Sequence, residues 1–303
     1  MVTVGRATVG ADCEWRVPPL PGAFVEAYLA RLGLDPAAER AAAPSPERLR
    51  RLHAAHVAGA IYETLWIALG EPLGIDPVES ARRVARGRGG YCYHLNGAFS
   101  ALLTSLGYDV RWHRGGVQGR AAPVPPGDDG NHLALTARLD GRTWWLDVGL
   151  GDGPLDPVPL ADARFGPGFR LRRSDVVPDG WRLDHEPAGS FAGMDFSLGP
   201  TEPAALLPRH VELSTSPDSG FVRVVTAQHR TAAGTRALRG CVLSERSPAG
   251  AASVRDIDGY ADWRALLTDG FGLVLDDVPE ERLAALWRRV RADHERWDRA
   301  GRP

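Results

Sequence analysis

The sequence predicts a mixed α+β fold, with helices first, strands in the middle and both in the C-terminal third. Apolar residues recur every three or four positions through most of the first hundred residues, a spacing typical of amphipathic helices. From about residue 108 to 200 the pattern changes to short segments rich in β-branched and aromatic residues, separated by Gly, Asp and Pro. The 303 residues suffice for two or three modest domains.

Three helices are expected in the first part of the chain. The helical spacing runs through residues 22–34 and 45–70, and the second of these segments begins Ser-Pro-Glu, a typical helix start. A third helix is expected over about 91–106, entered through the glycines of GRGG and ended by Gly107 as a C-cap. Cys92 therefore lies in the first turn of a helix.

Short strands follow these helices. The segments with strand character in the middle of the chain are 111–117, 132–139, 143–150 and 180–186. The sequence LDGRT between the second and third segments predicts a hairpin turn. Residues 221–230 and 235–246 have the character of a further strand pair, and a Pro-started helix is expected over 279–296.

The composition argues against several classes of function. Hydrophobic residues make up 44% of the chain and charged residues 24%, which is ordinary for a globular protein. A net charge of -2 without a basic tract argues against nucleic-acid binding. No apolar run is long enough for a membrane span, and the N-terminus lacks a signal-peptide core. Three widely spaced cysteines without a CxxC pair argue against a disulfide framework and a zinc site. We therefore expect a cytoplasmic protein with free thiols and no bound metal.

Cys92 is the first candidate for chemistry. At the start of a helix, free backbone N–H groups and the helix dipole favour the thiolate, which is the nucleophilic form of cysteine. The preceding glycines allow a tight turn that presents the sulfur to a cleft. A buried structural cysteine at a helix start fits the same local pattern, and the local sequence alone does not separate the two interpretations.

His132 and Asp147 supply the partners that a nucleophilic thiol needs. His132 begins one strand of the expected hairpin, and a turn centred at 140–141 places it roughly opposite residues 147–149. A carboxylate beside an imidazole fixes its tautomer and supports the imidazolium. Each residue alone fits a structural role at a strand end. Together with Cys92 they predict a nucleophile, its base and the residue that orients the base.

Other His and Cys residues fit structural roles better. His94 follows the candidate nucleophile by two residues and projects away from it on a helix, so it is interpreted as structural or pocket-lining. His53 and His56 lie three apart on a predicted helix without partner ligands, which favours packing. Cys13 and Cys241 lack a helix-start context, and Cys241 lies in an apolar strand, where we expect a core residue.

The candidate residues lie within segments that match a known family. RGGYCYHLN resembles the RGGxCxExN motif of the arylamine N-acetyltransferases, and NHLAL followed by WWLDVGLG resembles their THxxL and LVDVGFG segments. IYETL resembles FENL, and STSPDSGFV resembles STxPxSxF. The order Cys–His–Asp also fits the family, and the resemblance extends from about residue 20 to 245.

The resemblance implies a three-part fold and a two-step reaction. An N-terminal helical bundle over 1–107 would carry the nucleophile, a central antiparallel β-barrel over 108–204 the His and Asp, and 205–303 would form an α/β lid. Acetyl-CoA or another acyl-CoA would acylate Cys92 as a cosubstrate, with no tightly bound cofactor. An arylamine, hydrazine or related amine would then attack the thioester. His132 would accept the thiol proton or hold an imidazolium beside a preformed thiolate.

The resemblance also implies which residues meet the substrates. Those expected to line the acceptor pocket are Tyr62, Val117, Asn131, Leu150 and Phe221. Gly149 and Gly151 are expected near the cofactor entrance. Backbone N–H groups near Cys92 and in segment 115–117 are candidate donors to an oxyanion.

Some positions depart from the family pattern. The departures are His94 for Glu, Tyr62 for Phe, Thr64 for Asn, Asn131 for Thr and Leu150 for Phe. None of them removes a member of the predicted triad, so acyl transfer is still expected, with an altered acceptor amine or acyl donor.

Three other functions stay open from the sequence. Within the family, the chain also fits an amide synthase of natural-product biosynthesis that takes its acyl group from a carrier protein or another unusual donor. A thiol hydrolase or transglutaminase-like enzyme uses the same residue order, although the RGGYC helix start and the DVGLG strand end favour the acyltransferases. A catalytically silent binding protein is the third possibility, motivated by His94 in place of Glu.

Overall fold

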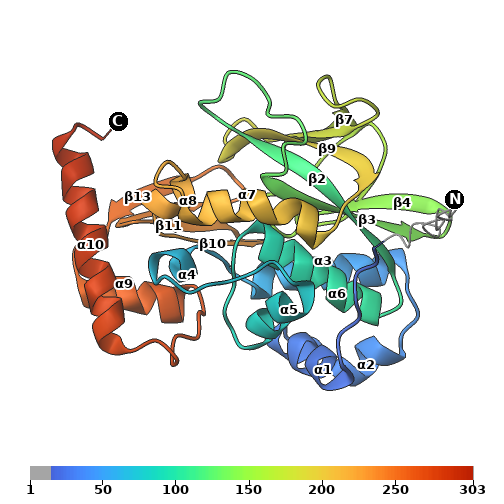
Figure 1. Cartoon of the computed structure of the whole chain (residues 1–303), viewed down its shortest axis with the longest axis horizontal. Coiled ribbons are helices and arrows are strands. Elements are labelled where there is room, and N and C mark those ends of the chain that lie inside the picture. Colours follow the sequence, from blue (N-terminus) through green and yellow to red (C-terminus); the bar gives the residue numbers. More distant parts are fainter. Residues whose placement is uncertain (1–14, 303) are drawn as a thin grey trace, which may run out of the picture.

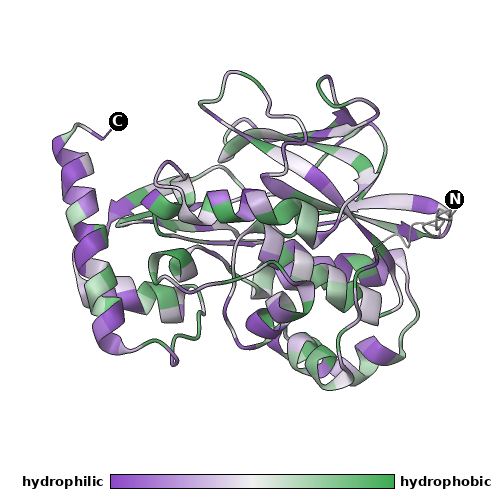
Figure 2. Ribbon diagram, in the orientation of Figure 1, coloured by the Kyte–Doolittle hydropathy of each residue, from purple (hydrophilic) through white to green (hydrophobic). Residues whose placement is uncertain are grey.

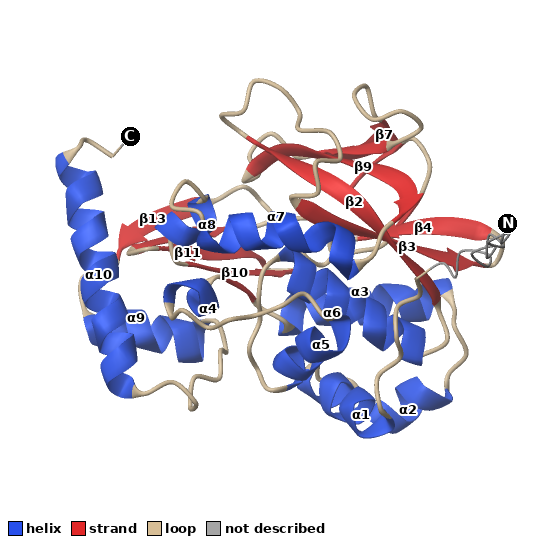
Figure 3. Ribbon diagram, viewed as in Figure 1, coloured by secondary structure: helices blue, strands red, loops and turns tan. Residues whose placement is uncertain are grey.

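The computed structural model describes residues 15–302, and Cys13 lies outside the described residues. Figure 1 shows the N-terminal helices on one side of a curled sheet, with a second sheet and the long last helix at the opposite end of the molecule. Figure 3 shows the same division by secondary structure, with helices gathered below and strands above and behind them.

The N-terminal helices begin where the sequence provides caps. They are α1 (Gly22–Arg31), α2 (Pro36–Ala41), α3 (Pro46–Gly59), α4 (Leu65–Ala68), α5 (Pro77–Ala85) and α6 (Cys92–Ser105). The side chains of Asp35, Ser45 and Asp76 accept hydrogen bonds from the first N–H groups of α2, α3 and α5, each of which has Pro in its first turn. The helix expected over 91–106 is confirmed as α6, and Gly107 after it adopts a φ of 88°.

The single helix expected over 45–70 is wrong in its second half. After α3 the chain forms the short strand β1 (Tyr62–Glu63), which joins the C-terminal sheet. The buried Glu63 carboxylate accepts a hydrogen bond from the Leu65 N–H at 2.7 Å and pairs with Arg83 at 2.7 Å. Strand pairing and a buried ion pair therefore override the local helical spacing.

Eight strands form a curled antiparallel sheet in the order β5-β4-β3-β2-β9-β8-β7-β6. They are β2 (Asp109–Gly119), β3 (His132–Leu139), β4 (Arg142–Leu146), β5 (Val158–Pro159), β6 (Ala163–Phe165), β7 (Phe169–Arg173), β8 (Trp181–Asp184) and β9 (Phe191–Pro200). The curl encloses an apolar interior that contains Trp145, Phe169 and Phe196. This half-barrel corresponds to the expected β-barrel, and the four segments predicted as strands fall in β2, β3, β4 and β8.

The hairpin of β3 and β4 forms as predicted. The Asp-Gly tip at 140–141 has φ values of 50° and 74°, the left-handed conformation that a type I′ turn requires at both central residues. The register pairs Leu135 with Leu146. Beyond this last pair the two segments continue side by side in opposite directions. His132 therefore lies opposite the segment that begins with Asp147.

A five-stranded antiparallel sheet and its helices form the C-terminal part. The strands run in the order β1-β10-β11-β12-β13, with β10 (Thr226–Thr231), β11 (Gly234–Arg239), β12 (Val242–Arg246) and β13 (Ala252–Asp256). The helices are α7 (Pro203–Thr215), α8 (Gly220–Arg223), α9 (Tyr260–Ala265), a π-helical turn over Leu266–Gly270, and α10 (Glu280–Arg299). Figure 2 shows hydrophilic residues along most of α10, whose apolar residues Leu283, Leu286 and Val290 belong to the core of this part.

The strand expected over 221–230 begins later than predicted. Residues up to 223 form α8, which Ser219 caps by accepting a hydrogen bond from the Phe221 N–H at 3.2 Å. The remainder forms β10, which pairs antiparallel with β11. The second strand expected over 235–246 is wrong as a single strand, because a turn at 240–241 divides it into β11 and β12, and Cys241 lies in that turn. The helix expected over 279–296 is confirmed as α10.

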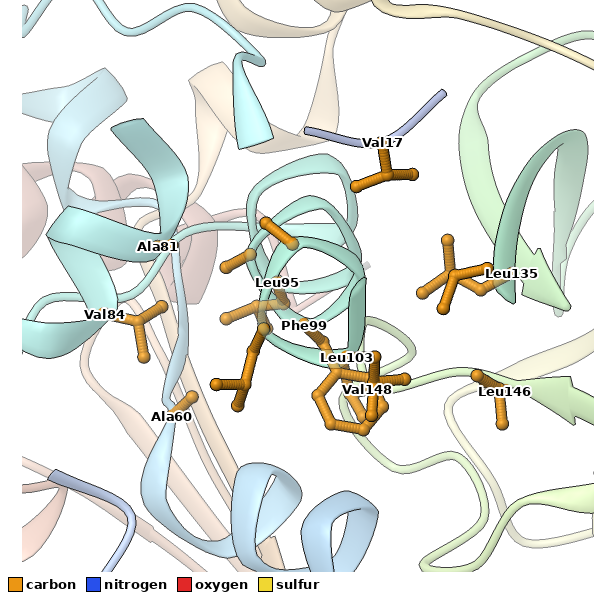
Figure 4. Close-up of a cluster of buried hydrophobic side chains, with 14 of the residues drawn as sticks. Val17, Ala60, Ala81, Val84, Leu95, Phe99, Leu103, Leu135, Leu146 and Val148 are labelled. Atoms are coloured by element: carbon orange, nitrogen blue, oxygen red, sulfur yellow. The ribbon is translucent and has the colours of Figure 1, made fainter. Parts of the chain in front are cut away.

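Helix α6 lies inside the N-terminal core. Every residue from 92 to 103 is buried. Figure 4 shows its apolar side chains between Leu146 of the curled sheet on one side and Val84 of α5 on the other. Because tight packing on both sides leaves a helix little room to shift, the first residue of α6 is held in a fixed place. The three-part α+β fold is thus confirmed, while its division at residues 107 and 204 stays a prediction.

Candidate active site

The loop before α6 fixes the position of the Cys92 sulfur. A Cβ atom at Gly89 would overlap the carbonyl oxygen of Ile61, so only glycine allows this close approach. The Arg83 Nε–H donates to the Gly89 carbonyl at 2.7 Å, and the Glu63 N–H donates to the Gly90 carbonyl at 3.0 Å. These bonds hold the loop from two sides, and Cys92 follows it with a side chain that lines the main cavity.

His132 and Asp147 form a buried hydrogen-bonded pair, as the hairpin predicts. The His132 Nε2 atom lies 2.7 Å from Asp147 Oδ2, and the residues are 2% and 3% exposed. Burial disfavours the charged imidazole, but the charges and hydrogen bonds of Asp147 and Cys92 outweigh it and raise the pKa of His132 to about 10. The His132 imidazolium therefore persists at neutral pH, between a carboxylate and the candidate nucleophile.

Asn96 holds the Asp147 carboxylate in place. Its Nδ2–H donates to Asp147 Oδ1 at 3.0 Å and to the Leu133 carbonyl at 2.6 Å, and its Oδ1 accepts from the Val148 N–H at 2.9 Å. The local sequence around Asn96 does not by itself predict this role. Asn96 follows Cys92 by four residues, so the two lie on the same face of α6, and this spacing is the signal that would have found it.

His53 supports the backbone of the same aspartate. Its Nε2 accepts a hydrogen bond from the Asp147 N–H at 3.3 Å, while its Nδ1 bonds to the Leu155 carbonyl at 2.7 Å. Burial lowers the pKa of His53, which keeps the ring neutral and able to accept. The sequence predicted a packing residue here, because nothing in the local pattern connects α3 with the end of β4.

One cavity of about 1280 Å³ contains Cys92 and His132 together with most of the predicted substrate residues. The predicted residues that line it are Tyr62, Val117, Asn131, Gly149, Leu150 and Phe221. Gly151 is absent from this lining. A Cβ atom there would lie 2.7 Å from the Gln228 side-chain oxygen, so Gly151 packs against β10 behind the cavity wall.

Asn131 engages the backbone of Val117 in the cavity wall. Its Oδ1 accepts from the Val117 N–H at 2.7 Å, and its Nδ2–H donates to the Val117 carbonyl at 3.3 Å. The Val117 N–H therefore already has a partner, which corrects the expectation that it is available to an oxyanion. The β3 ladder with β2 ends at the Gly115–His132 pair, and the Asn131 amide satisfies the next free backbone groups of β2.

His94 is a structural residue of the protein interior. Its Nε2 bonds to the Gly74 carbonyl at 3.1 Å, and its ring lies 5.1 Å from the rings of both Trp66 and Tyr91. Burial, with smaller contributions from His210 and Arg83, lowers the pKa of His94 to about 3. His94 is thus neutral and does not line the cavity, which resolves the two roles that the sequence left open.

Residues 15–302 contain no cluster of three or more His, Cys, Asp or Glu side chains suited to a metal ion. Within the same range no helix is long and apolar enough to cross a membrane.

Cys241 is buried, as expected for a core residue, and burial raises the pKa of its thiol to about 11. The two cysteines of the described chain therefore differ in their surroundings. His132 interacts with Cys92 and bonds to Asp147 at 2.7 Å, whereas the His294–Asp256 pair near Cys241 is longer, at 3.6 Å.

Comparison with known proteins places this geometry in a family. A family model described as N-acetyltransferase matches residues 46–279. Proansamycin X synthase of Amycolatopsis mediterranei (strain S699) is 34% identical over 157 residues, which cover 48% of this chain and 57% of that protein. The arylamine N-acetyltransferase of Mycolicibacterium smegmatis is 30% identical over 269 residues, covering 83% of this chain and 92% of that protein. The chain thus aligns with just over half of the first relative and with nearly all of the second.

The fold comparison leads to the same family. The structure of Mycobacterium marinum arylamine N-acetyltransferase in complex with CoA superposes with a TM-score of 0.78 at 28% identity, covering 88% of this chain and 99% of that one. The two folds agree over most of both chains, and the family model spans most of this sequence. The chain therefore belongs to the arylamine N-acetyltransferase family of acyltransferases.

Proposed function

We propose that the protein is an N-acyltransferase that moves an acetyl or other acyl group from acyl-CoA through a Cys92 thioester to an arylamine, hydrazine or related amine. The observation that carries the proposal is the His132–Asp147 pair at 2.7 Å beside Cys92, at the wall of one large cavity. The pair supplies what a thiol nucleophile needs, which is a proton acceptor held in one orientation.

The first half-reaction loads the enzyme. The Cys92 sulfur, paired with the His132 imidazolium, attacks the carbonyl carbon of the acyl-CoA thioester and forms a new C–S bond. The C–S bond to CoA then breaks, and the CoA thiolate takes the proton from His132. The products are an acylated Cys92, neutral His132 and free CoA thiol.

The second half-reaction transfers the acyl group. The amine nitrogen attacks the Cys92 thioester, and His132 accepts the proton that this nitrogen loses. The bond to the Cys92 sulfur breaks, which releases the amide and restores the thiolate–imidazolium pair. Asp147 keeps the His132 Nε2 proton in place throughout, so that the other ring nitrogen always addresses the sulfur and the amine.

The parts of the chain divide this work. Residues 1–107 provide the nucleophile, 108–204 provide the base and its carboxylate, and 205–303 form the outer wall of the cavity. Tyr62, Val117, Asn131, Leu150 and Phe221 are the proposed substrate contacts, with Gly149 near the thioester entrance. We place the protein in the cytoplasm, since a reducing compartment keeps the nucleophilic thiol free.

A second function has its own support. Proansamycin X synthase is among the relatives of this chain, and the cavity of about 1280 Å³ is far larger than an acetyl group requires. Both observations favour an amide synthase or acyltransferase of natural-product biosynthesis, which would take a bulkier acyl group from a carrier protein or another unusual donor. The chemistry at Cys92 would be the same.

Steady-state kinetics test the proposal. With acetyl-CoA and a panel of arylamines and hydrazines, we expect CoA thiol release and N-acetylated product, with parallel lines in double-reciprocal plots. The Cys92→Ser variant serves as the control for uncatalysed transfer. Absence of turnover with acetyl-CoA, combined with acylation of Cys92 by longer thioesters, would replace the first function by the second.

A further inference from the structure

Three arginines from separate elements line the outer part of the Cys92 cavity. Arg223 belongs to α8, Arg239 ends β11 and Arg289 lies on α10, and all three are exposed. These elements are gathered at the end of the molecule away from α1–α3 (Figure 1). Because Cys92 and His132 of the same lining are buried while the three arginines are exposed, the arginines mark the solvent side of the cavity.

Some other arginines on the same elements have carboxylate partners, unlike these three. On β11, Arg236 pairs with Glu245 at 2.7 Å, and on α10, Arg291 pairs with Asp258 at 2.9 Å. Within residues 15–302, the side chains of Arg223 and Arg239 form no hydrogen bond or ion pair, and the Arg289 side chain donates only to the Ala68 carbonyl at 2.7 Å. Arg282 and Arg288 of α10 also lack a carboxylate partner within these residues, but neither lines the cavity. The three arginines of the lining are therefore set apart by combining both properties.

The acidic side chain in the cavity lining does not neutralise the three arginines. Asp293 is the carboxylate that α10 contributes to the cavity, and it pairs with Arg296 one turn further along the helix. The field of Arg239 reaches inward as well, since it lowers the pKa of Tyr62 against the larger opposing effects of burial and Cys92. The cavity therefore has a cationic outer rim and, near the thiol, a wall that includes Val117, Leu150 and Phe221.

We propose that Arg223, Arg239 and Arg289 form an anion-binding rim that holds the phosphate groups of a phosphopantetheinyl acyl donor while its thioester reaches Cys92. The inference rests on the proposed function. Guanidinium groups bind phosphate oxygens through paired N–H donors, and three of them without carboxylate partners suit a ligand with several negative charges. The pantetheine arm, which carries no charge, would occupy the less polar stretch between the rim and the thiol.

Donors that differ only in phosphate content test the rim. The rate of Cys92 acylation is measured by mass spectrometry with acetyl-CoA, acetyl-4′-phosphopantetheine and S-acetylpantetheine, which has no phosphate. We expect acetyl-CoA to acylate wild-type protein at least about tenfold more efficiently than S-acetylpantetheine at low salt, and this advantage to shrink as salt is raised. Arg223→Gln, Arg239→Gln and Arg289→Gln should each reduce the efficiency with acetyl-CoA by roughly threefold to tenfold and leave S-acetylpantetheine unchanged.

Arg288→Gln provides the matched control. Arg288 is exposed on α10 next to Arg289 but does not line the cavity, so its loss should alter none of the three rates. If the arginine variants are also acylated less efficiently by acetyl-4′-phosphopantetheine, the rim binds the phosphate that CoA shares with the phosphopantetheine arm of a carrier protein. Dependence of acetyl-CoA alone would assign it to the nucleotide phosphates.

Two results would overturn the rim. One is an equal loss with all donors in the Gln variants, which indicates a structural role, and the other is no loss with any donor. Failure of every donor to acylate wild-type Cys92 is a different result, because it contradicts the proposed function itself. The phosphate-free donor thus separates the two claims.

Discussion

The two walls of the Cys92 cavity are built in different ways. The inner wall comes from α6, β3 and the end of β4, where Cys92 and Asp147 are each only 3% exposed and hydrogen bonds join all three segments. The outer wall comes from α8, β10 to β12 and α10, and its residues include Val224 at 41% exposure and the three arginines that have no carboxylate partner within residues 15–302.

This difference separates chemistry from substrate choice. A change in the inner wall leaves buried polar groups without partners, which destabilises the protein and misplaces the reacting atoms. A change in the outer wall alters contacts with a ligand and little else. We therefore expect substitutions in the outer wall to alter the choice of substrate without disturbing the proposed reaction at Cys92.

The largest effect should come from the nucleophile. Cys92→Ala removes the sulfur that accepts the acyl group, so acyl-enzyme formation should be abolished. Cys241→Ala is the matched control, because Cys241 lines the same cavity but burial raises the pKa of its thiol to about 11, so it should be dispensable for acylation. Retention of an acyl adduct in the Cys92 variant, followed by mass spectrometry, would move the nucleophile elsewhere.

The next largest effect should come from the carboxylate. Asp147→Asn preserves the size of the side chain but supports the wrong His132 tautomer, and we expect kcat/KM to fall by about 10⁴-fold, as in a serine triad. The melting temperature should change little compared with this loss. Turnover close to that of wild type would remove Asp147 from the catalytic group.

Substitution of Asn96 tests whether the hydrogen bonds that hold Asp147 in place affect the stability of the protein and its rate. Asn96→Leu leaves the Leu133 carbonyl and the Val148 N–H without side-chain partners, which should lower the free energy of unfolding by about 1–3 kcal/mol. Displacement of Asp147 should reduce kcat by on the order of 10²-fold. If stability falls but the rate is unchanged, Asn96 supports the fold and does not orient the triad.

The charge on His132 gives a test by pH. Its pKa of about 10 in the folded protein lies above its usual value of 6.5, so the proton is bound more tightly in the folded state. The resulting stabilisation is complete below about 6.5 and is lost as pH rises through about 10. In NMR spectra the His132 ring signals should shift near pH 10; a midpoint near 6.5 would contradict the ion pair.

The outer part of the pocket should show the smallest effects. Val224→Phe enlarges a side chain in the outer wall of the cavity and should change KM for amines by about tenfold or less, in a direction that depends on the amine. The rate of Cys92 alkylation by a small reagent should stay at the wild-type value. A large loss of alkylation would mean that the two walls are coupled.

The sequence predicts well what local signals determine. The cap at Ser45, the C-cap at Gly107 and the Asp-Gly hairpin all lie within a few residues of the structure they produce, and the hairpin alone brings His132 to Asp147. The His132–Asp147 pair was therefore predictable from one local hairpin, whereas the approach of Cys92 on α6 to this pair depends on packing between distant segments.

The incorrect or missing predictions depend on contacts between distant segments. The helix over 45–70 breaks because β1 pairs with β10, and Glu63 meets Arg83 twenty residues further along the chain. The bond between His53 and the Asp147 N–H joins residues 94 positions apart. Spacing within one element contains no information on such pairs, so the supports of the inner wall could be identified only from the fold.

The central claim is that Cys92 forms a thioester during transfer. Protein incubated with acetyl-CoA and without an amine should gain the mass of one acetyl group, located by peptide mapping on Cys92 and lost when an arylamine or hydrazine is added. An adduct on Cys13 or Cys241 would contradict a Cys92 thioester. So would an adduct on Cys92 that is not lost although the added amine is acetylated.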